Sequence, residues 1–106
     1  MSLDVYLNKD KETIYTSNIT HNLTGMAEEA GIYKHLWRPE ELHIKKASEL
    51  IDPLIEGLSK MLREPERFRK FNAPNGWGRY EDFIRFVQEY IIACADNPDS
   101  EVETWR

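Results

Sequence analysis

The chain has 106 residues, of which 41% are hydrophobic, 31% charged and 11% aromatic, and its formal net charge is −5. This length suffices for one domain with its own core, so folding needs no metal or disulfide. The apolar content excludes a disordered chain, and no apolar run approaches the roughly 20 residues of a membrane span. We therefore predict a single domain over residues 1–106 that does not enter a membrane.

The acidic excess is spread evenly, because residues 1–53 carry 6 basic and 9 acidic side chains and residues 54–106 carry 8 and 10. No basic half or tail can neutralise phosphates, so we expect no nucleic-acid partner. The single cysteine, Cys94, and the absence of a secretory signal pattern in residues 1–10 predict a reducing, cytoplasmic location.

Two strands are expected first in the chain. Residues 3–7 alternate apolar and more polar side chains at the period of a half-buried strand, and residues 13–19 are rich in β-branched and aromatic types. The polar residues 8–12 predict a five-residue connection, so the pair forms a β-hairpin. A third strand over 102–105 is expected to join it, because an isolated hairpin is only marginally stable in water.

Helices are expected between these strands. Thr20 can cap a first helix that Gly31 ends. Residues 47–62 carry one apolar stripe at helical spacing, with Pro53 inside it. Because the stripe keeps its phase across the proline, we favour one kinked helix over two separate helices with Asp52 as a cap.

A short helical segment that can bury Phe68 and Phe71 follows Pro65, and a last helix runs from Tyr80 to the Asn97-Pro98 pair. This order predicts an α+β fold: a small antiparallel sheet, made of the N-terminal hairpin and the C-terminal strand, with three to four helices packed on one face. Edge strands of such a sheet can pair between copies, so the sequence also allows a homodimer.

The junction between the second strand and the first helix, residues 16–22, contains many hydrogen-bonding side chains. A helix start presents free amides, and His21 and Asn22 add side-chain donors, which together suit an anion. The alternative is structural, with Thr20 as a cap and His21 as ordinary polar surface.

A second segment, residues 33–41, places Trp37 and Arg38 before Pro39 and then two glutamates in the first turn of a short helix. An indole beside a guanidinium can form a cationic, aromatic wall for a ligand or a partner. The alternative is a loop that Trp37 pins to the core.

The third segment, residues 72–79, contains the turn signal Asn75-Gly76 and places a glycine on each side of Trp77. The indole can therefore line a pocket or lie over the core. The segment lacks the spacing of a phosphate-binding loop.

The sequence supports a catalytic site or a metal site less well than a binding site. The three histidines are too scattered for a metal motif, and no serine lies in a nucleophile context. Cys94 lies on the apolar stripe of the last helix and is expected to be a buried, inert thiol. We therefore predict no metal, no cofactor and no catalytic residue.

Four stretches carry a resemblance: Thr16-Ser-Asn-Ile-Thr-His-Asn-Leu-Thr24, Ala27-Glu-Glu-Ala-Gly-Ile-Tyr33, Leu36-Trp-Arg-Pro-Glu-Glu-Leu42 and Asn75-Gly-Trp-Gly-Arg-Tyr80. In them the chain resembles a family of short bacterial and phage proteins that form a domain of unknown function. The resemblance implies a free-standing small protein of that origin and transfers no activity and no catalytic residue.

The leading hypothesis from the sequence is a non-enzymatic binding or accessory module for an unidentified small ligand or protein. Its polar-aromatic site would combine six residues of the three segments: His21, Asn22, Trp37, Arg38, Asn75 and Trp77. One alternative is a small enzyme with His21 as acid or base on an anionic substrate held by Arg38. Another is a phage protein that docks onto a host protein, for which the aromatic residues would be exposed.

Overall fold

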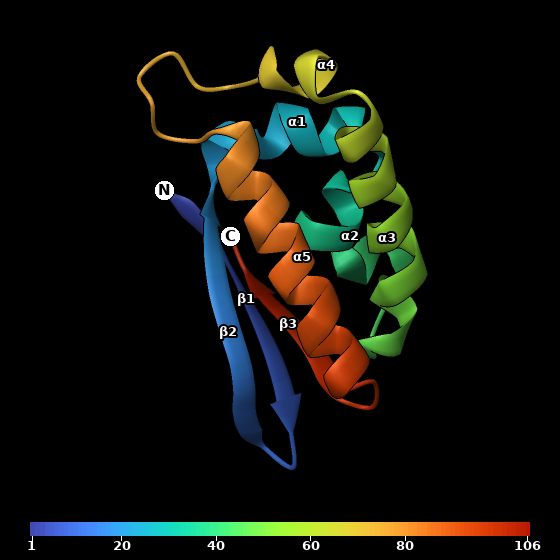
Figure 1. Cartoon of the computed structure of the whole chain (residues 1–106). Coiled ribbons are helices and arrows are strands. Elements are labelled where there is room, and N and C mark those ends of the chain that lie inside the picture. The colour runs from blue at the N-terminus through green and yellow to red at the C-terminus, as the bar shows by residue number, and fades with distance from the viewer.

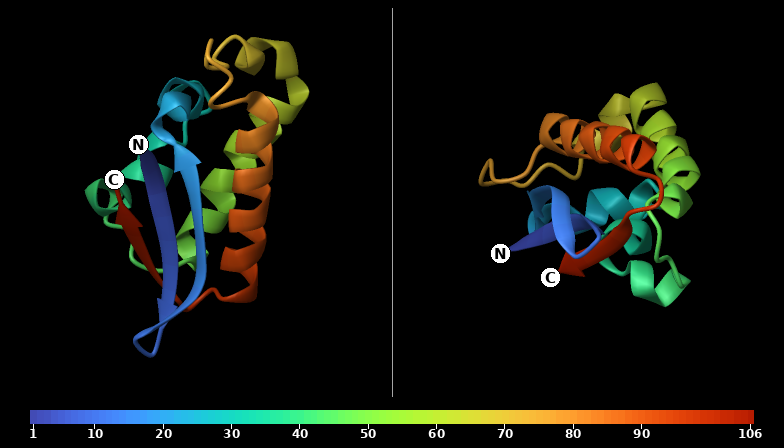
Figure 2. Two further views of the ribbon diagram at one scale, coloured as in Figure 1. Left: turned by 90° about the vertical axis from the view of Figure 1, so that its left-hand side faces the viewer. Right: turned by 90° about the horizontal axis from the view of Figure 1, so that it is seen from below.

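The computed structural model describes residues 1–106 and contains one three-stranded antiparallel sheet with helices gathered on one face (Figures 1 and 2). Strands β1 (Ser2–Lys9), β2 (Glu12–Thr20) and β3 (Glu101–Trp105) lie in the order β2-β1-β3. The predicted α+β fold and the predicted third strand are confirmed. The strand nearest the N-terminus is thus the central one, and it joins both ends of the chain.

The hairpin connection is shorter than the sequence predicted. Only Asp10 and Lys11 lie between β1 and β2, and their φ values of 53° and 68° are those of a tight two-residue hairpin turn. The five-residue connection was therefore wrong. Asn8, Lys9 and Glu12 belong to the strands, where they pair across the ladder. Their polarity reflects exposed strand ends, not a loop.

The first predicted helix begins where expected, as a single 3-10 turn η1 (His21–Leu23) followed by α1 (Thr24–Glu29). Thr20 caps it, because its hydroxyl accepts a hydrogen bond from the amide of Asn22 at 3.2 Å. Gly31 follows with a φ of +80°, which ends the helix as predicted.

A short helix that the sequence did not predict follows, α2 (Tyr33–Trp37). Its last two residues, Leu36 and Trp37, are buried, so packing against the core stabilises a helix whose local signals are weak. The short helix expected after Pro39 is confirmed as the 3-10 turn η2 (Pro39–Leu42).

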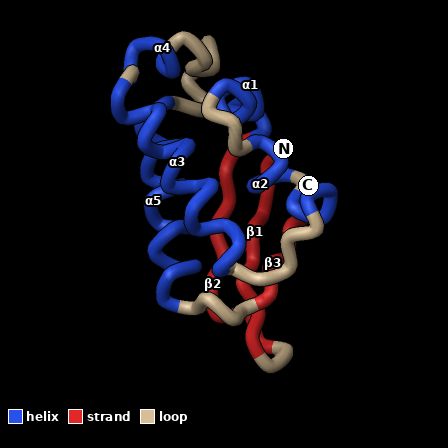
Figure 3. The backbone as a smooth tube through the Cα atoms, turned by 90° about the vertical axis from the view of Figure 1, so that its right-hand side faces the viewer, coloured by secondary structure: helices blue, strands red, loops and turns tan.

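The helical layer is built from α3 (Ser48–Arg63), α4 (Pro65–Arg69) and α5 (Tyr80–Asp96). The predicted single helix across Pro53 is confirmed, since α3 is continuous through it. Helices α3 and α5 lie side by side and run in opposite directions, and α5 also contacts β2 (Figures 1 and 3). None of the helices combines the length and the apolarity that a bilayer crossing requires.

One cluster of 23 buried residues fills the space between the sheet and the helices. Alternate residues of β1 (Leu3, Val5 and Leu7) are fully buried, whereas the residues between them are partly exposed on the open face of the sheet. The outer edge of β3 is covered at its first two residues, because the Val102 amide donates to the carbonyl of Lys45 and Lys46 bridges Glu101. The rest of β3 and the outer edge of β2 have no strand beside them.

The loop that carries the third predicted segment lies between α4 and α5, and one buried hydrogen bond fixes the helix ends beside it. The Tyr80 hydroxyl donates to the Met61 carbonyl at 2.7 Å. In a regular helix that carbonyl would accept from the amide four residues on, which is Pro65 and has no N–H. Tyr80 thus replaces a hydrogen bond that the sequence makes impossible.

Replacing Tyr80 with Phe should therefore lower the free energy of unfolding by about 1–2 kcal/mol, because the Met61 carbonyl would stay buried without a partner. Urea denaturation measures the change. Tyr6→Phe, on the open face of the sheet, is the matched control and should change stability by less than about 0.5 kcal/mol. Equal effects of the two substitutions would contradict the role given to Tyr80.

Candidate functional site

The structure brings the three predicted segments to η1, but it divides their six site residues into two groups. On one side of the turn His21 contacts Trp37, and Arg38 follows Trp37 in the chain. Asn22, the next residue, joins Asn75 and Trp77 on the other. Neighbouring residues of one turn therefore hold two aromatic residues with different surroundings.

Trp37 is part of the core, with only 2% of its surface exposed. Its indole N–H donates to Nδ1 of His21 at 2.9 Å, and the ring of Tyr33 stacks on it with centroids 5.6 Å apart. A buried indole whose one polar atom is already paired adds no open wall to a binding site. The structural alternative raised for this segment describes Trp37 better than the ligand wall does.

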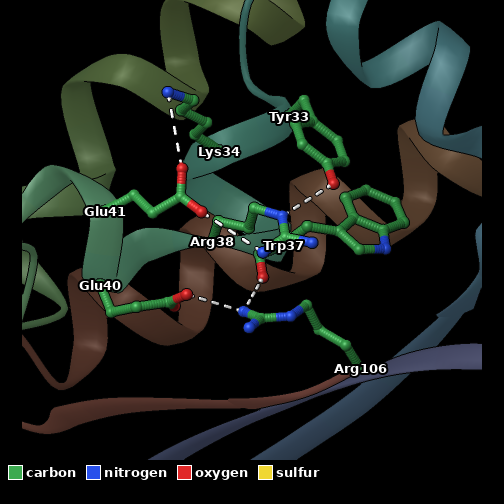
Figure 4. A network of polar contacts seen from close by, with 7 residues as sticks. All are labelled: Tyr33, Lys34, Trp37, Arg38, Glu40, Glu41 and Arg106. Atoms are coloured by element: carbon green, nitrogen blue, oxygen red, sulfur yellow. Dashed lines mark hydrogen bonds and ion pairs between the residues drawn. The ribbon is translucent and has the colours of Figure 1, made fainter.

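Arg38 is held within its own segment, as Figure 4 shows. Its Nε donates to the Tyr33 hydroxyl at 3.2 Å, and its Nη1 lies 3.3 Å from a carboxylate oxygen of Glu41. The hydrogen bond to Tyr33, together with the charge of Glu41, raises the pKa of Arg38 above its ordinary value. The guanidinium is thus permanently charged but already has an anionic partner.

Arg106 closes this network from the far end of the chain (Figure 4). Its Nη1 donates to the Trp37 carbonyl at 2.9 Å and to the Glu40 carboxylate at 2.8 Å. Arg106 could not be predicted as a neighbour of this segment, because nothing in the pattern of residues 101–106 points to residues 37–40. Only the pairing of β3 with β1 brings the two ends together.

The second group fixes the backbone of Trp77 on both sides. The side-chain amide of Asn22 donates to the Trp77 carbonyl at 2.8 Å, and the Trp77 amide donates to Oδ1 of Asn75 at 2.9 Å. Gly78 has a φ of +128°, and a Cβ there would lie 2.9 Å from Cγ2 of Thr20. The loop therefore approaches η1 so closely that glycine is required.

Trp77 itself is 74% exposed, the highest exposure of the three tryptophans. Figure 1 shows its loop projecting beside the first turn of α5. A surface hollow of about 380 Å³ lies next to it, lined by Asn22, Phe71, Asn72, Ala73, Pro74 and Asn75.

Three asparagines line that hollow, and each uses only one of the two polar groups of its side-chain amide in a hydrogen bond within the chain. Asn22 and Asn75 hold the Trp77 backbone, and Asn72 accepts from the amide of Tyr80 at 2.7 Å. The oxygen of Asn22 and the NH₂ groups of Asn72 and Asn75 make no hydrogen bond within the chain, so one acceptor and two donor groups of the lining have no partner. Phe71 and Asn72 extend the predicted set, and Asn72 opens the segment that the sequence had singled out.

Catalytic chemistry finds little support in this geometry. The five main surface hollows are lined by neither His21 nor Arg38. Cys94 is buried, as expected, and burial raises the pKa of its thiol to about 12. No three side chains of His, Cys, Asp or Glu lie close enough together to hold a metal ion.

Comparison with protein-family models, with curated proteins and with solved structures found no match to this chain.

The His21–Trp37 contact predicts an energetic coupling between the two residues. Trp37→Phe removes the indole donor, and His21→Ala removes the imidazole acceptor. Each substitution should lower the free energy of unfolding by about 1–2 kcal/mol. Because both remove the same hydrogen bond, the double variant should be less destabilised than the sum, by about 1 kcal/mol. Urea denaturation of the four proteins measures this coupling. Pairing Trp37→Phe with Asn22→Ala is the control, and strict additivity in the His21 cycle would contradict the contact.

Proposed function

We propose that this chain is a non-enzymatic binding module that holds a segment of a partner protein with Trp77 and the asparagine-lined hollow beside it. The observation that supports this function is the contrast between the fixed backbone of Trp77 and its exposed side chain. Its backbone amide and carbonyl are both fixed by asparagine side chains, yet its indole is 74% exposed. A large apolar side chain is thus held in solvent by a loop built around it.

An exposed tryptophan on an anchored loop suits a protein interface. Tryptophan is among the residue types that contribute most to interface affinity, because its large ring removes much apolar area from water. Fixing the loop in advance lowers the ordering cost of binding. These two properties are combined at Trp77 and at neither of the other tryptophans, since Trp37 is buried and Trp105 lies on a strand end.

The hollow indicates the chemistry of the partner. The unpaired oxygen of Asn22 and the unpaired NH₂ groups of Asn72 and Asn75 offer both an acceptor and donors, which suit the amide and carbonyl groups of a peptide main chain. Phe71 and Pro74 add apolar surface between them. This combination favours an extended peptide segment or loop over a charged ligand, because no cationic side chain lines the hollow.

Two other hypotheses fit less well. A small-ligand pocket of the predicted kind needs Trp37 as one of its walls, but the Trp37 indole is buried. An enzyme needs His21 and Arg38 in one cleft, whereas Arg38 is paired with Glu41. Docking onto a host protein is a specific form of the proposed function, and it agrees with the exposure of Trp77. A phage or bacterial origin and a cytoplasmic location, which the free thiol of Cys94 favours, stay predictions.

Selection of peptides from a displayed random library against the wild-type protein tests the proposal. The selected peptides should bind at least about tenfold more weakly to Trp77→Ala, because loss of a central interface tryptophan costs about 2 kcal/mol or more. Isothermal titration calorimetry with the synthesised peptides measures the affinities.

Trp105→Ala is the matched control, because Trp105 is 62% exposed but lies at the end of β3. Peptide affinity should be unchanged in this variant. Asn22→Ala, which frees the Trp77 carbonyl, should weaken binding by a smaller factor than Trp77→Ala. Selection of no peptides, or of peptides that bind Trp77→Ala as tightly as the wild type, would contradict the proposed function.

A further inference from the structure

The open face of the sheet, opposite the helices, combines aromatic rings with carboxylates and has no helix across it (Figure 2). Side chains directly opposite each other on two antiparallel strands share a face, with Cβ atoms about 5 Å apart. Three such pairs of β1 and β3 occupy the open face: Asp4 with Trp105, Tyr6 with Glu103, and Asn8 with Glu101. Each aromatic ring therefore has a carboxylate as its neighbour. None of these residues belongs to the site around Trp77.

Trp105 is held in place on this face while 62% of its surface stays in water. Its indole N–H donates to one carboxylate oxygen of Glu103 at 2.6 Å, and the other oxygen accepts from the side-chain amide of Asn8 at 2.7 Å. The π face of an indole attracts cations, and a carboxylate beside the ring acts in the same direction. This arrangement suits a cationic group.

No basic side chain pairs with the carboxylates of the open face. The ion pairs of the chain lie elsewhere, among residues 29–81 and Arg106. Arg106 follows Trp105 directly, but its guanidinium donates to Glu40 of η2. The negative charge of the face is therefore left for a cationic partner.

The hairpin end of the same face is hollowed. The hollow has a volume of about 540 Å³ and is lined by polar residues only: Asn8, Asp10, Lys11, Thr13, Glu101 and Glu103. Its carboxylates outnumber its one cation, Lys11, which lies in the hairpin turn. Negative charge thus extends along the face from Asp4 to the turn, and a partner that follows the strands meets carboxylates along its whole length.

We propose that this face binds an extended segment of a partner protein that carries arginine at alternate positions. A guanidinium fits these neighbours, because it stacks on aromatic rings and donates paired hydrogen bonds to a carboxylate. A nucleic acid is a poor occupant, because the carboxylates repel its phosphates. The proposal goes beyond the proposed function, since it concerns another surface and a charged partner.

The alternate spacing of the arginines follows from the geometry of the face. Residues two apart in an antiparallel strand point to the same side and lie about 6.8 Å apart, so the three side-chain pairs repeat at that distance. An extended segment laid along the strands has the same repeat, and each of three guanidinium groups can reach one carboxylate. Three adjacent arginines would point alternately toward the face and away from it, so only two could reach it.

Titration of the ¹⁵N-labelled full chain with a synthetic peptide, followed by two-dimensional NMR, tests the proposal. The probe is a serine heptapeptide with blocked ends and arginine at its second, fourth and sixth positions. It should bind with a Kd on the order of 100 μM, as expected for a few exposed ionic and cation–π contacts, and shift the amide signals of β1 and β3. The same peptide with its three arginines adjacent should bind about threefold more weakly, because one contact is lost.

Two variants of the face should weaken binding. Asp4→Asn combined with Glu101→Gln removes two charges at nearly constant side-chain shape and should raise the Kd at least about fivefold. Trp105→Ala should raise it about fivefold, because the cation–π contact is lost. The matched control is Asp52→Asn combined with Glu56→Gln, which removes the same charge from exposed positions of α3 and should change the Kd less than about twofold.

Four results would overturn the proposal. They are no signal shift at millimolar peptide, equal effects of the two charge-removing double variants, equal affinity for the peptide with adjacent arginines, and equal affinity for spermidine, which has cationic groups without the peptide geometry. Trp77→Ala should leave the Kd of the arginine peptide unchanged, whereas peptides selected through Trp77 should tolerate Trp105→Ala. Failure of this proposal and failure of the proposed function are therefore distinguishable.

Discussion

The hydrogen bond from the Asn22 side chain to the Trp77 carbonyl is the contact on which the functional account depends. It fastens the loop between α4 and α5 to η1, which follows directly from β2. The close approach of Gly78 to Thr20 reinforces the same junction. Without this junction the indole of Trp77 would belong to a free loop, and its exposure would carry no information about binding. With it, the exposure is a fixed property of the fold.

The two tryptophans of the predicted site show how position within the fold separates side chains of one type. Trp37 is at the end of α2, where burial of its ring and the hydrogen bond to His21 make it a core residue. Trp77 is held by its backbone only, so its ring is left to solvent. The same residue type therefore supports the fold in one place and supplies a contact surface in the other.

Much of the fold could be predicted from the sequence, because its signals are local and strong. Alternation marked β1, the apolar stripes marked α3 and α5, and Thr20 and Gly31 marked the ends of the first helix. The errors have physical causes. Asp10 and Lys11 form a tight turn without the usual glycine, and α2 is stabilised by burial of Trp37, not by local propensity. The three segments of the site could be predicted from the sequence. That neighbouring residues of η1 would contact two different tryptophans, one buried and one exposed, could not, because the exposure of a side chain depends on packing against residues far away in the sequence.

Binding by Trp77 as proposed requires the loop to be fixed and the indole to be exposed at the same time, and the backbone dynamics of the free protein measure the first of these. A ¹⁵N relaxation experiment on the free protein gives the order parameter of the Trp77 amide. We expect a value of about 0.85, equal to that of α5, together with rapid quenching of the exposed indole by iodide in a Trp105→Phe variant. An order parameter below about 0.6, as in a flexible loop, would contradict the claim that the fold presents this tryptophan for binding.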